Sequence, residues 1–194
     1  MRRIFFISGI AGLFLAVILL PGCANTIRLG EQPTEVRMVY LLDLGRHTRL
    51  AFELTDGNLV EYAYGEWQWY ARMEDQWWRV PAVMLWPTQG TLGRWEWPAP
   101  RAKARLLDEY AGLIVLELPA EARKVDALIA GLERDFRSRS RELLRNTTYR
   151  LDFVPYHRQY WLFNNSNHAV KEWLKELGYE VEGSGIVADW KYGR

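Results

Sequence analysis

Three polar residues, Asn165, Ser166 and Asn167, stand directly before an amphipathic segment near the end of the chain. From Ala169 the apolar residues recur at helical spacing, and Gly178 supplies the left-handed residue that commonly ends such a helix. Ser166 therefore lies at a predicted helix start, where free backbone N–H groups and the positive end of the helix dipole stabilise an anion. A serine in this place is either a nucleophile or, with its Asn neighbours, part of an ordinary helix cap.

A serine nucleophile needs a base to take its proton and N–H donors for the oxyanion, which the helix start around Ser166 would provide. His47 is the candidate base, because it leads the polar face of an alternating segment, residues 47–54, that predicts a strand. His157 and His168 are its rivals. The three histidines lack the spacing of a zinc site, and no Gly-rich phosphate loop is present, so the sequence predicts neither a metal nor a cofactor.

The order of these motifs resembles that of a known superfamily. Residues 164–169, Asn-Asn-Ser-Asn-His-Ala, are similar to the Asn-Cys-Asn signature of circularly permuted NlpC-type, papain-like proteins, in which a His-bearing strand precedes the nucleophile helix. Residues 45–52 resemble the His-Thr strand of that family, and residues 60–67 resemble the strand that follows it. Residues 83–87 are similar to a run in an uncharacterised bacterial group of the superfamily, the urease-region conserved hypothetical proteins. Ser166 stands where the family pattern has Cys.

The resemblance implies an α+β fold in which an antiparallel sheet packs against helices in a permuted papain-like (NlpC-type) architecture, formed by residues 36–194 as a single domain. It makes Ser166 the nucleophile and His47 the base. Glu61, on the following strand, matches the place of the polar third residue that orients the base, although a partner strand can present either face. The residues that the resemblance places beside the substrate are Asn165, Asn167, Tyr64 and Trp67.

Serine in place of cysteine changes the chemistry that is required. A thiol beside an imidazole ionises, whereas a serine hydroxyl must lose its proton in the transition state to a well-oriented base. Two functions therefore stay open: hydrolysis or acyl transfer on an amide or acyl substrate such as a cell-wall peptide, and a pseudoenzyme that keeps the cleft only to bind. A third is an envelope protein that uses a Trp-rich surface, because the 10 Trp of the chain suit stacking on glycan or peptide, or a membrane surface.

The N-terminus predicts export and lipid attachment. Arg2 and Arg3 precede an uninterrupted run of 17 apolar or small residues, Ile4–Leu20, and residues 20–23, Leu-Pro-Gly-Cys, resemble a bacterial lipobox. We therefore expect residues 1–22 to be a signal peptide and Cys23 to carry the lipid. The protein would then face the periplasm from the inner or outer membrane. A spanning anchor is the alternative, because 17 residues are at the lower edge for crossing a bilayer.

The charge and the cysteine content of the chain limit the classes of partner and site that the sequence supports. Without Arg2 and Arg3, the chain keeps 23 of its 25 basic residues against 24 acidic ones, so no basic excess favours nucleic acid. Cys23 is the single cysteine, so lipidation leaves no thiol for a disulfide or a metal. The expected partners are the membrane, through the lipid on Cys23, and peptidoglycan or another envelope protein.

The remaining patterns predict the elements that would hold the site. Residues 23–35 are expected to be a tether, and residues 36–44, 47–54 and 59–64 to be a meander of strands with a hairpin turn at Asp56-Gly57. Residues 66–79 predict a helix ending before Pro81, with most of its aromatic side chains in the core. The further predictions are strands at residues 91–97, 113–118 and 147–154, a loop at 155–157, and helices at 102–110 and from Pro119 to about 138.

Overall fold

The structure, a computed structural model, describes residues 24–193, so the predicted signal peptide and Cys23 lie outside the described residues. Its strands are β1 (Asn25–Leu29), β2 (Val36–Asp43), β3 (Thr48–Glu53), β4 (Leu59–Glu66), β5 (Thr88–Trp97), β6 (Ile114–Glu121), β7 (Leu144–Asn146), β8 (Leu151–Tyr160), β9 (Tyr179–Glu182) and β10 (Trp190–Tyr192). Its α-helices are α2 (Val80–Leu85), α3 (Ala102–Glu109), α4 (Ala122–Ser138) and α5 (Ser166–Glu176). A π-helical turn, η1 (Trp67–Ala71), and two 3-10 turns, η2 (Trp77–Arg79) and η3 (Ser140–Glu142), complete the set.

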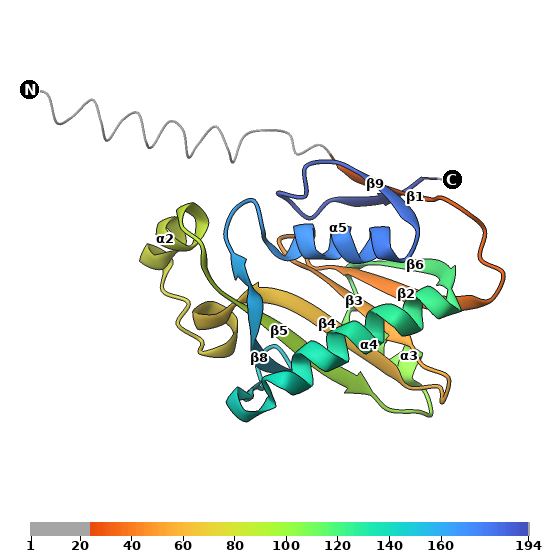
Figure 1. The fold of residues 1–194 in the computed structure, drawn as a ribbon, viewed down its shortest axis with the longest axis horizontal. Coiled ribbons are helices and arrows are strands. Elements are labelled where there is room, and N and C mark those ends of the chain that lie inside the picture. The colour runs from red at the N-terminus through yellow and green to blue at the C-terminus, as the bar shows by residue number, and fades with distance from the viewer. Residues whose placement is uncertain (1–23, 194) are drawn as a thin grey trace, which may run out of the picture.

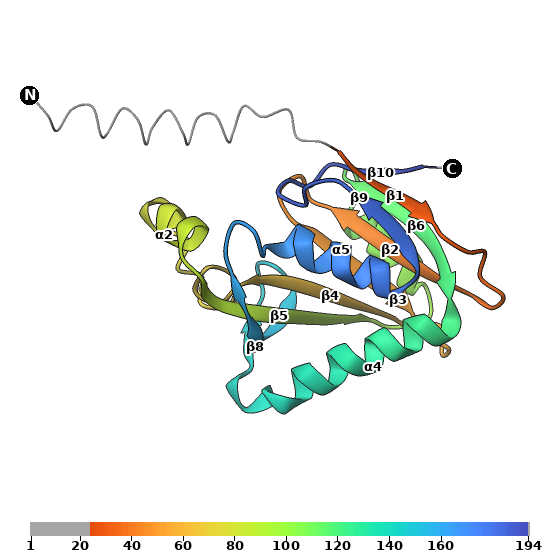
Figure 2. The same ribbon diagram turned by 45° about the horizontal axis from the view of Figure 1, so that its top comes forward.

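The strands form two sheets. The larger is fully antiparallel and has the order β6-β2-β3-β4-β5-β8-β7, and the smaller has the order β10-β1-β9, with β1 and β10 parallel. Helix α5 lies between the two sheets, and α4 runs beside it over the same face of the larger sheet (Figures 1 and 2). The fold is therefore a mixed α/β arrangement of mostly antiparallel sheets packed with helices, as the sequence predicts at that level.

Alternation along β3 and β4 divides the core into two faces. Leu50, Phe52, Val60 and Tyr62 are buried against α4 and α5, whereas Ala51 and its neighbours face α3 on the other side of the sheet. The turn between the two strands contains Gly57 at φ +82°, a left-handed conformation that glycine adopts without strain. The predicted hairpin is thus present, with Leu59 paired to Glu53 across it.

Helix α5 forms for the reasons that the sequence indicates. Its apolar stripe is buried and faces the larger sheet, and the stripe consists of Ala169, Val170, Trp173, Leu174 and Leu177. The side chain of Asn165 caps its first turn, and Gly178 follows its end at φ +96°. Ser166 is the first helical residue.

The segment expected to be a tether contributes a strand instead. Residues 25–29 form β1, in which Asn25 and Ile27 are fully buried and Ile27 belongs to the main core. β1 pairs with β9 on one side and with β10 on the other, both from the end of the chain. Because both partners are distant in sequence, no local pattern in residues 25–29 reveals the pairing. The fold therefore begins about ten residues earlier than the expected start at residue 36.

The aromatic segment after β4 is also different from its prediction. A single helix over residues 66–79 does not form, because the turn η1 ends and Met73 then adopts a positive φ of 58°. Pro81 does not stop a helix but lies in the first turn of α2, a position where its missing N–H is harmless. Of the rings expected in the core, Trp67 is buried, while Trp77 and Trp78 are exposed.

Two prolines that were predicted outside strands lie inside them. Pro119 was expected to open a helix, yet it pairs with Met38 in β6, and α4 begins three residues later at Ala122. β6 is an edge strand, where a missing N–H does not interrupt the sheet. Pro155, predicted in a loop, lies in β8 beyond the short β7, so it also has a strand neighbour on one side only.

Strand β1 provides a direct test of where the fold begins. Ile27→Ala should lower the free energy of unfolding by about 2–5 kcal/mol, because it removes a fully buried aliphatic side chain from the core. Val36→Ala is the matched control, since Val36 is 57% exposed and its change should stay within about 0.5 kcal/mol. Urea denaturation followed by circular dichroism measures both. Equal, small effects of the two changes would show that residues 25–29 are a tether after all.

Candidate active site

Ser166 opens helix α5 in a closely packed setting. The Oδ1 atom of Asn165 accepts the backbone N–H groups of Asn167 at 2.9 Å and of His168 at 3.2 Å, which satisfies two of the free donors of the helix. The N–H of Ser166 has no acceptor among residues 24–193. Ser166 itself is only 1% exposed. The helix start therefore keeps a free N–H donor beside the serine hydroxyl.

His47 lies next to Ser166 although 119 positions separate them in the sequence. Its Nδ1 atom is 3.2 Å from the Oγ atom of Ser166, and its Nε2 atom is hydrogen-bonded to the hydroxyl of Tyr70. The two rival histidines are elsewhere: His168 bonds to the cap residue Asn165, and His157 is exposed near the far end of α4. Of the three histidines, His47 is the one that the fold brings to the serine.

A buried chain of hydrogen bonds fixes this approach. The hydroxyl of Thr48 donates to Oδ1 of Asn167 at 2.7 Å and accepts the indole N–H of Trp190 at 2.7 Å. The three residues are 1–3% exposed, so water does not replace these bonds. They join β3, α5 and β10 at one point. Because Thr48 is the neighbour of His47 and Asn167 the neighbour of Ser166, this bond sets the distance between the two reactive side chains.

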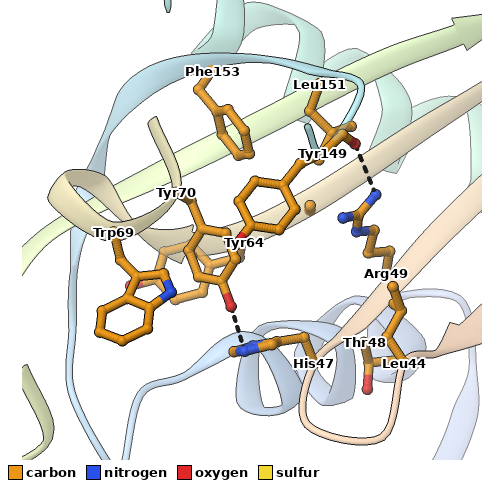
Figure 3. Close-up of a pocket in the computed structure, with 12 residues that line it drawn as sticks. Leu44, His47, Thr48, Arg49, Tyr64, Trp69, Tyr70, Tyr149, Leu151 and Phe153 are labelled. Atoms are coloured by element: carbon orange, nitrogen blue, oxygen red, sulfur yellow. Dashed lines mark hydrogen bonds between the residues drawn. The ribbon is translucent and has the colours of Figure 1, made fainter. Parts of the chain in front are cut away.

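Tyr70 closes the other side of the His47 ring (Figure 3). It comes from the π-helical turn η1, and its ring meets the imidazole edge-on, with 5.1 Å between the centroids. Gly65 of β4 makes this possible, because a Cβ atom there would lie 2.5 Å from the tyrosine ring. The amide of Asn146 holds the turn by donating to the carbonyl of Tyr70 at 2.5 Å. Burial raises the pKa of Tyr70 well above its ordinary value, so the hydroxyl keeps its proton.

The surroundings of His47 favour its neutral form. Burial lowers its pKa to about 4, and the positive charges of Arg49 and Arg46 act in the same direction. No Asp or Glu of the described residues contacts its ring. The imidazole therefore carries no charge at neutral pH, and the developing charge of an imidazolium would have no carboxylate beside it.

Glu61, the residue expected to orient His47, lies on the other face of the sheet. It is paired with Ala51 and so points away from α5. Its Oε1 atom accepts from Nη1 of Arg49 at 2.9 Å and from the hydroxyl of Tyr110 at 2.7 Å, and its Oε2 atom accepts the indole N–H of Trp97 at 2.9 Å. Strand alternation explains the difference, since His47 lies in the loop before β3 and does not follow the parity of that strand. Tyr70 takes the place assigned to Glu61.

The residues expected to contact a substrate make contacts that hold the fold together. Asn165 caps the helix, and Asn167 receives the hydroxyl of Thr48. Trp67, the first residue of η1, is 8% exposed and packs in a small apolar cluster. Tyr64 is 2% exposed, and although it lines the cavity beside His47, its hydroxyl has no hydrogen-bond partner among the described residues. The side chains of these residues are committed to the fold, and their contact with a substrate stays a prediction.

Two small cavities lie around Arg49, and one of them reaches the histidine. The first, of about 170 Å³, is walled mainly by aromatic and apolar side chains and reaches His47 and Tyr70 (Figure 3). The second, of about 230 Å³, lies over the Arg49–Glu61 pair, and Arg49 lines both. Ser166 lines neither cavity. Within residues 24–193 no cluster of His, Cys, Asp or Glu has the arrangement of a metal site.

The sequence analysis did not identify three residues that shape the site: Thr48, Arg49 and Tyr70. Thr48 was seen only as half of a His-Thr motif, and its polar side chain on an otherwise apolar strand face was the available signal. Arg49 is a charged residue on the opposite face of the same short strand, which indicates a buried partner. Tyr70 gave no signal, because its position depends on a π-helical turn that no periodicity predicts.

Comparison with known proteins adds no relative: no family model, no curated protein and no solved structure matches the chain.

The Thr48 bond can be tested by its effect on stability. Thr48→Val keeps the side-chain volume but leaves Oδ1 of Asn167 and Nε1 of Trp190 without a partner, so the free energy of unfolding should fall by about 1–3 kcal/mol. Thr34→Val, at an exposed position, is the matched control and should change it by less than about 0.5 kcal/mol. Chemical denaturation measures both. A Thr48→Val protein as stable as the control would remove this bond from the account of the site.

The charge state of His47 can be read by NMR. The imidazole resonances of His47, assigned by their absence in His47→Gln, should titrate with a midpoint near pH 4 rather than near the ordinary 6.5. Because the folded pKa lies below the unfolded one, the contribution of His47 to stability is complete above pH 6.5 and is lost as the pH falls towards 4. His47→Gln should flatten the stability profile in that window. A midpoint at or above 6.5 would mean that a negative partner outweighs burial and the two arginines.

Proposed function

We propose that this protein is a lipid-anchored protein of the bacterial cell envelope whose permuted papain-like (NlpC-type) cleft binds an amide-containing ligand, such as a cell-wall peptide, without cleaving it. The observation that carries the proposal is the pair formed by Ser166 and His47. Nδ1 of His47 and Oγ of Ser166 are 3.2 Å apart, yet burial and two arginines hold the pKa of His47 at about 4. A weak base beside a neutral hydroxyl does not make a nucleophile.

The serine hydroxyl would need more from its surroundings than they offer. In acyl transfer by serine, the histidine takes the proton and becomes an imidazolium, which a buried carboxylate stabilises in the established triads. Here Arg49 and Arg46 oppose that charge, and Tyr70 supplies a neutral hydroxyl in place of the carboxylate. The barrier for proton transfer is therefore raised at the step on which serine chemistry depends.

The tautomer of His47 also favours binding over catalysis. The hydroxyl of Tyr70 keeps its proton, and Nε2 of His47 is its side-chain partner among the described residues. When that hydroxyl donates to Nε2, the proton of the neutral ring is on Nδ1, the nitrogen that faces Ser166. An Nδ1–H group donates to the serine oxygen and cannot accept its proton. This arrangement holds the serine in place but does not activate it.

The same atoms are suited to binding. The N–H of Ser166 at the positive end of α5 has no acceptor among residues 24–193, so a ligand carbonyl would find a donor there once the packing over the buried serine opens. The adjoining cavity offers aromatic walls of Trp69, Tyr70 and Tyr149 for an apolar or planar group. A peptide or glycopeptide of the cell wall has both carbonyl groups and apolar or planar groups of this kind. The export signal and lipobox-like run at the N-terminus support an envelope location for this ligand.

The alternative function is a serine hydrolase or acyltransferase acting on the same class of substrate. It is favoured by the approach of Nδ1 of His47 to Oγ of Ser166 at 3.2 Å and by the free N–H beside it, which are two of the parts that acyl transfer needs. The alternative requires the tautomer in which Tyr70 accepts from Nε2. It also requires a ligand that stabilises the imidazolium.

Covalent probes distinguish the two functions. We expect wild-type protein to be inert to a fluorophosphonate, while Ser166→Cys is alkylated by iodoacetamide at pH 6, where an ordinary thiol with pKa of about 8.5 is almost fully protonated. The thiolate would be favoured by the helix start and by the charges of Arg49 and Arg46. Intact mass spectrometry measures both reactions.

Two controls make the result specific. Ser138→Cys, at an exposed position near the end of α4, reports the reactivity of an ordinary surface thiol and should be several-fold slower at pH 6. His47→Gln in the Ser166→Cys background should change the pH dependence of alkylation. Fluorophosphonate labelling of the wild type that disappears in His47→Gln would establish the serine enzyme and reject the binding function.

A further inference from the structure

The segment between η1 and β5 carries the most exposed aromatic side chains of the described residues. Trp77 is 77% exposed, Trp78 62% and Trp86 66%, and Leu85 between them is 50% exposed. The segment projects from the body of the protein as the α2 arm (Figures 1 and 2), which we define as residues 72–87. Three exposed indoles on one short arm are not explained by the core, because none of them is buried in it.

The arm is a formed structure that continues into a neighbouring turn. The N–H of Leu162 donates to the carbonyl of Met84 at 3.2 Å, which ties α2 to the turn before α5. In that turn Phe163 is 57% exposed and lies edge-on to Trp161, with 5.2 Å between the ring centroids. The bond from Leu162 to Met84 ties together two segments that both carry exposed apolar side chains, and we call this set the aromatic surface: Trp77, Trp78, Leu85, Trp86 and Phe163.

The charges of the arm do not indicate a charged ligand. The arm has two basic residues, Arg72 and Arg79, and two acidic ones, Glu74 and Asp75, so it carries no net charge, and Arg79 and Glu74 form an ion pair on the arm itself. Its exposed apolar groups are mostly indole and aliphatic, and indole rings are the side chains that prefer the boundary between lipid headgroups and acyl chains. The chemistry of the aromatic surface therefore matches a lipid bilayer more closely than an acidic or basic partner.

The start of the described chain adds a geometric argument. Strand β1 begins at Asn25, only two positions after Cys23, so a lipid on Cys23 would hold the small sheet directly against the membrane. In both views the start of β1 and the α2 arm lie towards the same, upper side of the protein (Figures 1 and 2). A lipid at the start of β1 and the arm would therefore lie towards the same side of the protein.

We infer that the aromatic surface inserts into the interface of the bilayer that anchors the chain, so that the protein has two points of attachment and a fixed orientation. The inference rests on the lipid anchor of the proposed function. The turn that carries Phe163 leads directly into Asn165 and Ser166, so this orientation brings the start of α5 close to the membrane surface. The ligand would then be met at the bilayer and not at a distance from it.

Depth-dependent fluorescence quenching tests the inference on the full-length, membrane-extracted protein. The protein is reconstituted into phosphatidylethanolamine and phosphatidylglycerol vesicles with and without lipids brominated near the top of the acyl chains. Residues 1–23 contain no Trp, so all indole emission comes from residues 24–194. We expect bromine to remove up to about three tenths of the emission, because Trp77, Trp78 and Trp86 are three of 10 indoles.

The triple variant Trp77→Ser, Trp78→Ser, Trp86→Ser should lose this quenching, and it should unfold at the same denaturant concentration as the wild type because the three side chains are exposed. Trp95→Phe, which removes a half-buried indole of the larger sheet, is the matched control and should keep the quenched component. Co-sedimentation with the vesicles reports the anchor separately and should be the same for all variants.

The outcomes separate the inference from its premise. A wild type that co-sediments but is not quenched, or quenching that survives in the triple variant, overturns membrane insertion of the aromatic surface while leaving the anchor intact. Unquenched protein that forms cross-linked dimers lost in the triple variant also overturns it, in favour of self-association. A wild type that fails to co-sediment rejects the anchor, and insertion with it.

Discussion

The hydroxyl of Thr48 is the atom on which the arrangement of the site depends. It donates to Asn167 and accepts from Trp190, and all three residues are buried, so the larger sheet, helix α5 and the small sheet meet at a single polar point. Each bond is worth little in water, but an unpaired group here would carry its full desolvation penalty. The rigid juxtaposition of His47 and Ser166 is a consequence of this penalty, since any slip of β3 along α5 breaks both bonds.

The electrostatics around the pair favour an anion over a proton acceptor. Arg49 is placed beneath the sheet by Glu61 and acts on His47 from there, while the start of α5 presents an N–H to the serine. The positive charge of Arg49 and the N–H of the helix start would both stabilise a cysteine thiolate. A serine hydroxyl stays neutral, so neither group stabilises it appreciably. Under the proposed function, these are the surroundings of a thiol site that holds a hydroxyl, which would explain how a well-ordered dyad and weak basicity occur together.

The pattern of the sequence predicts the parts of the fold that depend on neighbours in the chain. The stripe of α5, the cap at Asn165 and the turn at Gly57 are local, and each is found where the residues indicate. The approach of His47 to Ser166 followed from the order of two motifs. Strand β1 and the position of Tyr70 could not be predicted, because one depends on partners about 150 residues away and the other on an irregular turn. The orientation of Glu61 was open for a simpler reason, since parity along β4 does not tell which face meets α5.

The chain order of the Thr48 bond has a kinetic consequence. Its partners lie 119 and 142 positions further along the sequence, the second of them in the last strand of the described chain. Contacts between residues so far apart in the sequence form late in folding. The entropy cost of closing the long loop must be met before the contact stabilises the chain. During synthesis the dyad therefore cannot assemble until β10 has been made, and a chain shortened by only these few residues would retain most of its core while losing the alignment of His47 and Ser166.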